Sequence, residues 1–203
     1  MIRVMVVDDH PVASAGVVEA LVKTGDIEVV GVAAALAEVE AMIATTCPDV
    51  ILCDVQLGPE RALDLPRKLQ PPAPPVVFFT GYDYPSYVRA AMDAGAAGYL
   101  LKTAPLAEIV AAIRWVATGG SAYATRDLRG ARAAPRMPSA REREVMALVA
   151  AGRTNAEIGA TLGLSERTVE SHLRRLFGRY GVESRLELTT FAMRLGWLDL
   201  SSG

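Results

Sequence analysis

Residues 1–118 contain five short apolar runs that alternate with amphipathic segments, and this alternation restricts the possible folds more than any other feature of the sequence. The runs are almost continuously apolar, as strands buried on both faces of a parallel sheet are. They lie at 2–7, 29–33, 50–53, 76–79 and 98–101, and segments of helical character lie near 11–23, 35–46, 60–69, 85–94 and 105–118. Five such units predict a doubly wound α/β domain with a five-stranded parallel sheet, whose ligands bind beyond the carboxyl ends of the strands.

Polar residues follow four of these strands at their carboxyl ends. They are Asp8 and Asp9 after the first strand, Asp54 after the third, Thr80 and Gly81 after the fourth, and Lys102 after the fifth. Three carboxylates that converge in one crevice repel each other unless a cation or a positive side chain lies among them. Mg²⁺, which prefers oxygen ligands, fits the first role, and Lys102 fits the second. Each carboxylate alone would be interpreted as a cap of a turn or helix, but the ordered set favours a site for a metal ion and a phosphoryl group.

The segment 138–198 carries the signals of four helices joined by tight turns. Capping-box patterns, in which Ser or Thr is followed three residues later by Glu, begin at Ser139 and Thr154. Helices are expected over 140–151, 155–162, 166–180 and 185–195. The turn at Gly163 joins the second of these to the third, which indicates a helix-turn-helix motif, whose second helix enters the major groove of DNA.

The helix over 166–180 has one apolar and one polar face. Apolar side chains recur at three- and four-residue spacing at Val169, Leu173, Leu176 and Tyr180, and we expect them to pack inward. The outer side then carries Glu170, Ser171, Arg174 and Arg175. A polar helix face is usually only solvated, but the capped turn before this helix favours contact with DNA.

The charge of the chain is divided unevenly. Residues 1–118 carry 8 basic and 14 acidic residues, a net charge of −6, whereas residues 119–203 carry 13 arginines and 9 acidic residues, a net charge of +4. This division indicates that the C-terminal part is the one that approaches nucleic acid. We therefore expect a domain over 1–118, a linker over 119–137 and an all-α helix-turn-helix domain over 138–203. Three environments are open to the linker arginines, namely DNA phosphates, the acidic domain and solvent, and solvent is the default for a charged linker.

The sequence also predicts the compartment. No stretch approaches the roughly 18 consecutive apolar residues of a membrane span, and the N-terminus leads directly into a strand pattern rather than a signal peptide. Cys47 and Cys53 lack metal-ligand spacing and are expected to remain free thiols. A cytoplasmic protein with no membrane partner is predicted.

Residues 1–118 resemble the receiver domain of two-component response regulators. The phrases VMVVDDHPV, PDVILCDVQL, VVFFTGYD and AGAAGYLLKT carry the resemblance. It implies that Asp54 takes a phosphoryl group from a sensor histidine kinase, that Thr80 and Lys102 bind this group, and that Tyr99 is the aromatic switch residue. It also implies that the Mg²⁺ ligands are Asp8, Asp9, Asp54 and the backbone carbonyl of Gln56.

The loop after Asp54 departs from the family pattern, in which Asp is followed by two residues, Met and Pro. Here the loop reads Val55-Gln56-Leu57-Gly58-Pro59, so that the proline is displaced by one position. This departure casts doubt on the geometry of the loop and on the lifetime of the phosphoryl group. Lys102 is followed by threonine rather than proline, so no cis peptide bond is expected there.

Residues 138–198 resemble the LuxR/NarL-type DNA-binding domain, through the phrase SAREREVMALVAAGRTNAEIGATLGLSERTVESHLRRLFGRYGV. The resemblance implies double-stranded DNA as a partner and a homodimer, formed on phosphorylation through the last helix. It also implies which residues contact DNA. The residues that face bases are then Glu170, Ser171 and Arg174, and the residues that face phosphates are Thr168, His172, Arg175, Arg179 and Arg153. For His172, packing between helices is an equally good interpretation as contact with a phosphate.

Two other functions remain open at this point. A phosphatase-like enzyme on a similar sheet would need a second acid two residues after Asp54, where the chain has Gln56. A regulator that works without phosphate would use the N-terminal domain for dimerisation or for a small ligand. We expect a phosphorylated transcription regulator that is not an enzyme.

Overall fold

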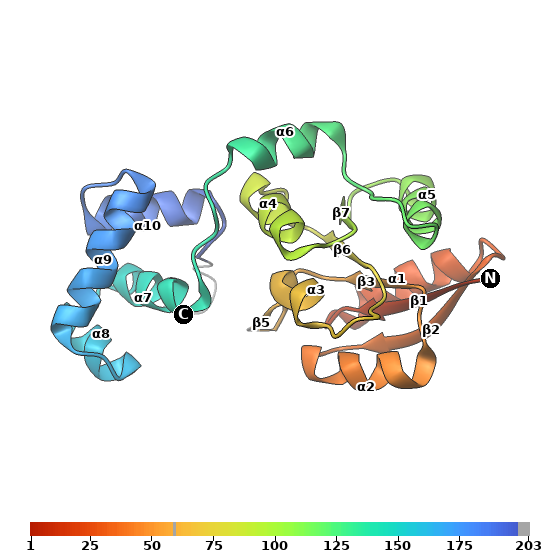
Figure 1. Ribbon diagram of the computed structural model, residues 1–203, viewed down its shortest axis with the longest axis horizontal. Coiled ribbons are helices and arrows are strands. Elements are labelled where there is room, and N and C mark those ends of the chain that lie inside the picture. Colours follow the sequence, from red (N-terminus) through yellow and green to blue (C-terminus); the bar gives the residue numbers. More distant parts are fainter. Residues whose placement is uncertain (59, 199–203) are drawn as a thin grey trace. The chain divides into compact units, whose positions relative to one another are not determined.

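Five strands of the N-terminal part form one parallel sheet in the order β2-β1-β3-β6-β7 (Figure 1). The strands are β1 (Ile2–Val7), β2 (Ile27–Ala33), β3 (Val50–Cys53), β6 (Val76–Thr80) and β7 (Gly98–Leu101). The computed structural model describes residues 1–58 and 60–198, and the chain divides into two compact units, Met1–Ala134 and Pro135–Gly203. The doubly wound parallel sheet that the apolar runs predict is confirmed.

Helices cover both faces of this sheet (Figure 1). They are α1 (Pro11–Val22), α2 (Leu36–Thr46), α3 (Leu65–Lys68), α4 (Pro85–Ala94) and α5 (Leu106–Ala117). On one face, Leu21 of α1 and Ile113 of α5 are fully buried against Val4, Leu52 and Val77 of the sheet. Because successive strand residues point to opposite faces, the next side chains along each strand face the other helices. Each strand is therefore buried on both sides, and its polar residues gather just beyond its carboxyl end.

The prediction of a helix near 60–69 is wrong for the first half of this segment. Instead, β4 (Gln56–Leu57) and β5 (Glu60–Arg61) form a small antiparallel pair, followed by a 3-10 turn, η1 (Ala62–Asp64), and the single turn of α3. The Ala62 N–H donates to the Val55 carbonyl at 2.8 Å and closes the base of this hairpin. Backbone groups that are paired across a hairpin are not available for helical hydrogen bonds, so the helix begins only at Leu65.

The linker expected over 119–137 also differs from the structure, because residues 125–133 form a helix, α6 (Thr125–Ala133), within the N-terminal unit. This helix packs on α4, where Gly130 lies next to Pro85. The Arg89 guanidinium of α4 donates to two carbonyls at the C-terminal end of α6, at 3.5 Å to Arg132 and at 2.5 Å to Ala134, the residue that follows the helix. The segment is therefore part of a folded unit rather than a solvated linker.

The C-terminal unit contains four helices, α7 (Ala140–Ala150), α8 (Asn155–Leu162), α9 (Glu166–Tyr180) and α10 (Arg185–Arg194). The capping boxes predicted at Ser139 and Thr154 are both present. Gly159 of α8 allows the close approach of the next turn, because a Cβ atom at this position would lie 2.6 Å from the Leu164 carbonyl oxygen. The predicted helix-turn-helix is confirmed in α8 and α9.

An aromatic cluster closes the core of this unit. Trp197 is 1 % exposed, and its ring centroid lies 4.8 Å from that of Tyr180 and 5.5 Å from that of Phe191. Within the described residues, no helix is long and apolar enough to cross a membrane. Cys47 and Cys53 are free thiols, the first exposed and the second buried.

Candidate functional site

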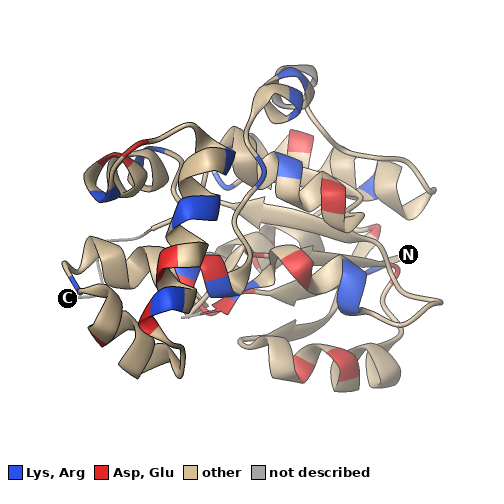
Figure 2. Ribbon diagram, turned by 60° about the vertical axis from the view of Figure 1, so that its left-hand side comes forward, with Lys and Arg blue, Asp and Glu red and all other residues tan. Residues whose placement is uncertain are grey.

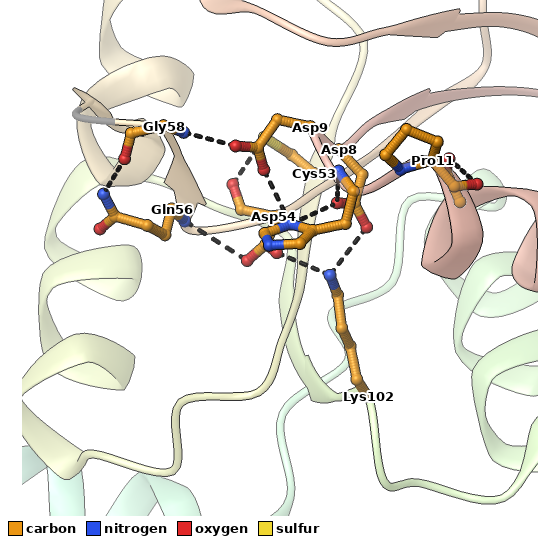
Figure 3. Close-up of polar contacts among 10 residues, drawn as sticks. Asp8, Asp9, Pro11, Cys53, Asp54, Gln56, Gly58 and Lys102 are labelled. Carbon is orange, nitrogen blue, oxygen red and sulfur yellow. Dashed lines mark hydrogen bonds and ion pairs between the residues drawn. The ribbon is translucent and has the colours of Figure 1, made fainter. Parts of the chain in front are cut away.

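Two buried carboxylates meet one lysine at the carboxyl end of the sheet (Figure 3). Asp8 follows β1 and Asp54 follows β3, and these residues are 4 % and 6 % exposed. The Nζ atom of Lys102, just after β7, lies 2.7 Å from Asp8 Oδ2 and 2.6 Å from Asp54 Oδ2. The parallel strands thus bring together side chains that are 46 and 48 positions apart in the sequence.

The third carboxylate, Asp9, is contacted from two other directions. The Gly58 N–H donates to Asp9 Oδ2 at 2.7 Å, and His10 Nδ1 lies 2.9 Å from Asp9 Oδ1. The ligand atoms of Asp8, Asp9 and His10 lie within 4.8 Å of one another. Asp9 remains 26 % exposed at its side chain, so this carboxylate forms the open side of the pocket.

The charges of the pocket are unequal. Although partial burial opposes the charge of Lys102, its hydrogen bonds to Asp54 and Asp8 raise the pKa of its ammonium group above the usual value. One ammonium group faces three carboxyl groups, whose ionised forms would leave two negative charges uncompensated. A divalent cation with a preference for oxygen ligands would balance them. The donor set of Asp8, Asp9 and Asp54 therefore fits Mg²⁺.

The thiol next to Asp54 is not a competing nucleophile. Cys53 is fully buried, and burial together with the charge of Asp54 raises its pKa well above the usual value. Its Sγ atom donates to the Asp54 carbonyl at 3.1 Å. Because the thiolate is the reactive form of cysteine, Cys53 stays protonated and inert.

Thr80 and Tyr99 connect the pocket to the start of α4. Thr80 ends β6, is fully buried, and accepts a long hydrogen bond of 3.5 Å from the Tyr82 N–H at its Oγ1 atom. The Tyr99 hydroxyl donates to the Tyr82 carbonyl at 2.7 Å. Tyr82 is thus held by both residues, and its ring also packs against Tyr84 and Tyr87 of the same segment. A movement of Thr80 would reach α4 through Tyr82.

The outer face of α9 is the candidate DNA surface. Val169, Leu173 and Leu176 are buried, as the periodicity predicts. The predicted base-facing residues, Glu170, Ser171 and Arg174, are all exposed, as are Arg175, Arg179 and Arg153. Thr168 and His172 are intermediate in exposure. Figure 2 shows that both signs of charge occur on the helices of this unit.

Several of these side chains are paired within the protein. Arg174 contacts Glu170 at 2.8 Å, and Arg175 contacts His172 Nδ1 at 3.2 Å. Arg179 reaches Glu142 of the α7 capping box at 3.0 Å, so it joins α9 to α7. The side chain of Arg153 lies 3.5 Å from Glu157. Thr168 shares a hydrogen bond of 2.7 Å with Ser165, the N-cap of α9. Contact of these residues with DNA stays a prediction.

Sequence reasoning missed two residues of the pocket, His10 and Gly58. The position of His10 beside the aspartate pair was a signal for the first. Gly58 was noticed only as a departure in the loop, because nothing local indicates that its N–H reaches Asp9, a residue 49 positions away. Gln56, expected to offer its carbonyl to a metal, donates its own N–H to Asp54 Oδ1 at 3.3 Å.

Comparison with known proteins identifies the family of the chain. Residues 4–114 match the family model for the response regulator receiver domain, and residues 139–192 match that for bacterial regulatory proteins of the luxR family. The chain is 36% identical to the probable transcriptional regulatory protein NarL of Mycobacterium tuberculosis, over 98% of this chain and 96% of that protein. It is 34% identical to the transcriptional regulatory protein UhpA of Salmonella typhimurium, over 97% and 100%. The solved structure of the response regulator ChrA, from a heme-sensing two-component system, is 34% identical, with a TM-score of 0.55 over 97% of this chain and 98% of that one.

Proposed function

The chain belongs to the response regulators that join a receiver domain to a LuxR-type DNA-binding domain, and on this premise we propose that phosphorylation of Asp54 controls how the C-terminal unit binds DNA. In this proposal a sensor histidine kinase supplies the phosphoryl group, and altered transcription is the outcome. The observation that carries the proposal is the geometry of Asp54, a buried carboxylate held 2.6 Å from Lys102 in a pocket with two further carboxylates.

The reaction transfers a phosphoryl group between two side chains. An oxygen of Asp54 attacks the phosphorus of a phosphohistidine on the kinase, so that an O–P bond forms while the N–P bond breaks and leaves a neutral imidazole after proton transfer. The Lys102 ammonium group stabilises charge on the phosphoryl oxygens. Asp8, Asp9, Asp54 and the carbonyl of Gln56 would hold Mg²⁺, which would supply further positive charge at this point. Since Gln56 offers no acid, we propose that the chain turns over only its own phosphoryl group.

The signal reaches α4 through Thr80. A phosphoryl group adds nearly two negative charges and three acceptor oxygens, and the Thr80 hydroxyl is the neutral donor of the site that can meet one of them. Its bond from Tyr82, at 3.5 Å, is long and easily exchanged. Tyr82 and Tyr99 would move with it and shift the start of α4. A change from 1% to 99% active chains requires about 5.5 kcal/mol of differential stabilisation.

The output is DNA binding by two copies of the chain. We propose that phosphorylation favours a homodimer, so that two α9 helices meet two half-sites of double-stranded DNA. Leu186 of α10 supports the dimer, because this large apolar side chain is 76% exposed. Contacts from α10 to a second copy would bury it.

The test measures phosphorylation and DNA binding together. Wild type and Asp54→Asn are incubated with acetyl phosphate and Mg²⁺, and intact mass spectrometry counts phosphoryl groups per chain. Binding to a duplex selected from a random library is then measured with and without phosphodonor. We expect one phosphoryl group and tighter DNA binding for wild type, and neither change for Asp54→Asn.

A matched control separates the site from the general loss of a charge. Asp64→Asn makes the same chemical change at an exposed residue of the receiver, which pairs loosely with Arg67 at 3.8 Å. This variant should behave as wild type. Equal DNA binding by wild type in all conditions, with or without phosphorylation, would contradict the proposed switch and leave a DNA-binding protein regulated elsewhere.

A further inference from the structure

The loop that follows Asp54 contains two short paired strands, β4 and β5. Gln56 pairs with Arg61 and Leu57 with Glu60 in antiparallel register, and Leu57 is only 4 % exposed. The hydrogen bond from Ala62 to Val55 closes the base of the hairpin at 2.8 Å. This loop is the one whose sequence departs from the family pattern. Its backbone is therefore placed firmly enough to direct individual N–H groups at the pocket.

One hydrogen bond connects this loop to the Asp9 carboxylate, and a second lies within the loop and reaches Gly58 (Figure 3). The Gly58 N–H donates to Asp9 Oδ2 at 2.7 Å, and the Gln56 side chain donates from Nε2 to the Gly58 carbonyl at 2.5 Å. Gly58 has a φ of +53°, in the left-handed region that favours glycine. The side chain of Gln56 thus holds Gly58 in the conformation that directs its N–H to Asp9.

Asp9 depends on this contact more than the other carboxylates do. Lys102 fixes Asp8 and Asp54, whereas Asp9 is contacted by Gly58 and by His10, whose side chain is 65% exposed. A carboxylate has about four acceptor positions on its two oxygens, so one amide hydrogen bond leaves room for a cation. A ligand that is already oriented loses less freedom when the cation binds.

We propose that Gly58 and Gln56 are positioning residues for Mg²⁺: Gly58 orients the Asp9 carboxylate through its N–H, and Gln56 holds Gly58 in place. This inference rests on the proposed function, which assigns Mg²⁺ to the pocket. The glycine of this loop then has a structural role, because its N–H group lies where Asp9 can accept a hydrogen bond.

The experiment measures Mg²⁺ affinity in the unphosphorylated full-length chain by isothermal titration calorimetry. Gln56→Met removes the donor to Gly58 while it keeps side-chain length, neutrality and the backbone carbonyl. Gly58→Ala keeps the N–H but disfavours the φ that directs it. We expect the dissociation constant for Mg²⁺ to rise about tenfold in each variant, as for other residues that orient metal ligands. Gln70→Met, the same change at an exposed glutamine, should leave the constant as in wild type.

A second readout distinguishes positioning from simple loss of stability. Melting temperatures measured without Mg²⁺ report folding of each variant, and the shift of the melting temperature on adding Mg²⁺ reports binding. A positioning role predicts a smaller Mg²⁺-induced shift in Gln56→Met even where its metal-free melting temperature equals that of wild type. Wild-type affinity in both loop variants would overturn the inference alone. If wild type itself binds no Mg²⁺, the proposed function fails, and the role assigned to Gly58 fails with it.

Discussion

Lys102 joins two buried carboxylates that would otherwise repel each other. Its ammonium group contacts both Asp8 and Asp54, and its side chain is 23% exposed against 3% and 7% for theirs. When one partner of a buried ion pair is removed, the other charge stays buried without compensation, which costs several kcal/mol. The stability of the pocket thus depends on the same residue to which the proposed function assigns a chemical role.

Replacement of this lysine should destabilise the metal-free protein strongly. We expect Lys102→Gln to lower the free energy of unfolding by about 3 kcal/mol, measured by urea denaturation in the presence of EDTA. Asp54→Asn in the same background should restore part of the loss, because one of the two repelling carboxylates is then neutral. Lys23→Gln is the control, since Lys23 pairs with Glu19 at the same 2.6 Å on the exposed surface. An equal loss in the two lysine variants would contradict this account, because exposed pairs contribute about 0–1 kcal/mol.

At the scale of elements, α6 shows how packing creates a helix that local sequence does not predict. An isolated helix of this length is marginal in water, and the segment 125–133 has few apolar residues. Ala131 and Ala134 are nevertheless buried, and small residues let α6 approach α4 closely. Arg89 then donates to carbonyl groups at the end of α6, which have no partner within the helix. The helix is formed by its contact with α4.

Removal of the Arg89 side chain should therefore loosen α6. We expect Arg89→Ala to raise amide hydrogen exchange in residues 128–134 about tenfold, since a hydrogen bond from a charged donor is worth roughly 1.5 kcal/mol or more. Exchange in β1 and β3 should be unchanged. The control is Arg114→Ala, which removes an arginine of α5 that forms an exposed ion pair with Asp26. Unaltered protection of α6 in Arg89→Ala would mean that other contacts hold this helix.

At the scale of the whole molecule, net charge distinguishes the part of the chain that binds DNA from the rest. The net charge of −6 over 1–118 and +4 over 119–203 confines attraction for DNA phosphates to the C-terminal part. Within that part, neighbouring residues of α9 have different expected tasks. Arg174, which contacts Glu170 at 2.8 Å, is expected to read a base, whereas Arg175 is expected at a phosphate.

Salt dependence distinguishes these two arginines. In fluorescence anisotropy with a selected duplex, Arg175→Gln should weaken binding to all sequences alike and lower the slope of log affinity against log salt by about 1. Arg174→Gln should cost about 1–3 kcal/mol on the selected duplex and much less on others. Arg114→Gln removes one positive charge from the other unit and should leave both quantities unchanged. Parallel losses for Arg174→Gln and Arg175→Gln on every duplex would contradict the assignment of base reading to Arg174.

The sequence by itself determined the five strands, most helices and the convergence of Asp8, Asp54 and Lys102. These features depend on local signals. Continuous apolar runs indicate strands buried on two faces, and Ser139 and Thr154 begin helices through groups only three residues away. The parallel order of the strands then places their carboxyl ends together, so that residues just after them must share one pocket.

Only the tertiary structure decided the hairpin after Asp54, the docking of α6, the burial of Trp197 and the hydrogen bond from Gly58 to Asp9. Each depends on partners that are remote in the sequence. The Gly58 N–H meets a carboxylate 49 residues away, and Arg89 reaches carbonyls 43 and 45 residues away. Local periodicity and capping carry no information about such contacts, because their free energy arises only once the chain has folded and brought the partners together.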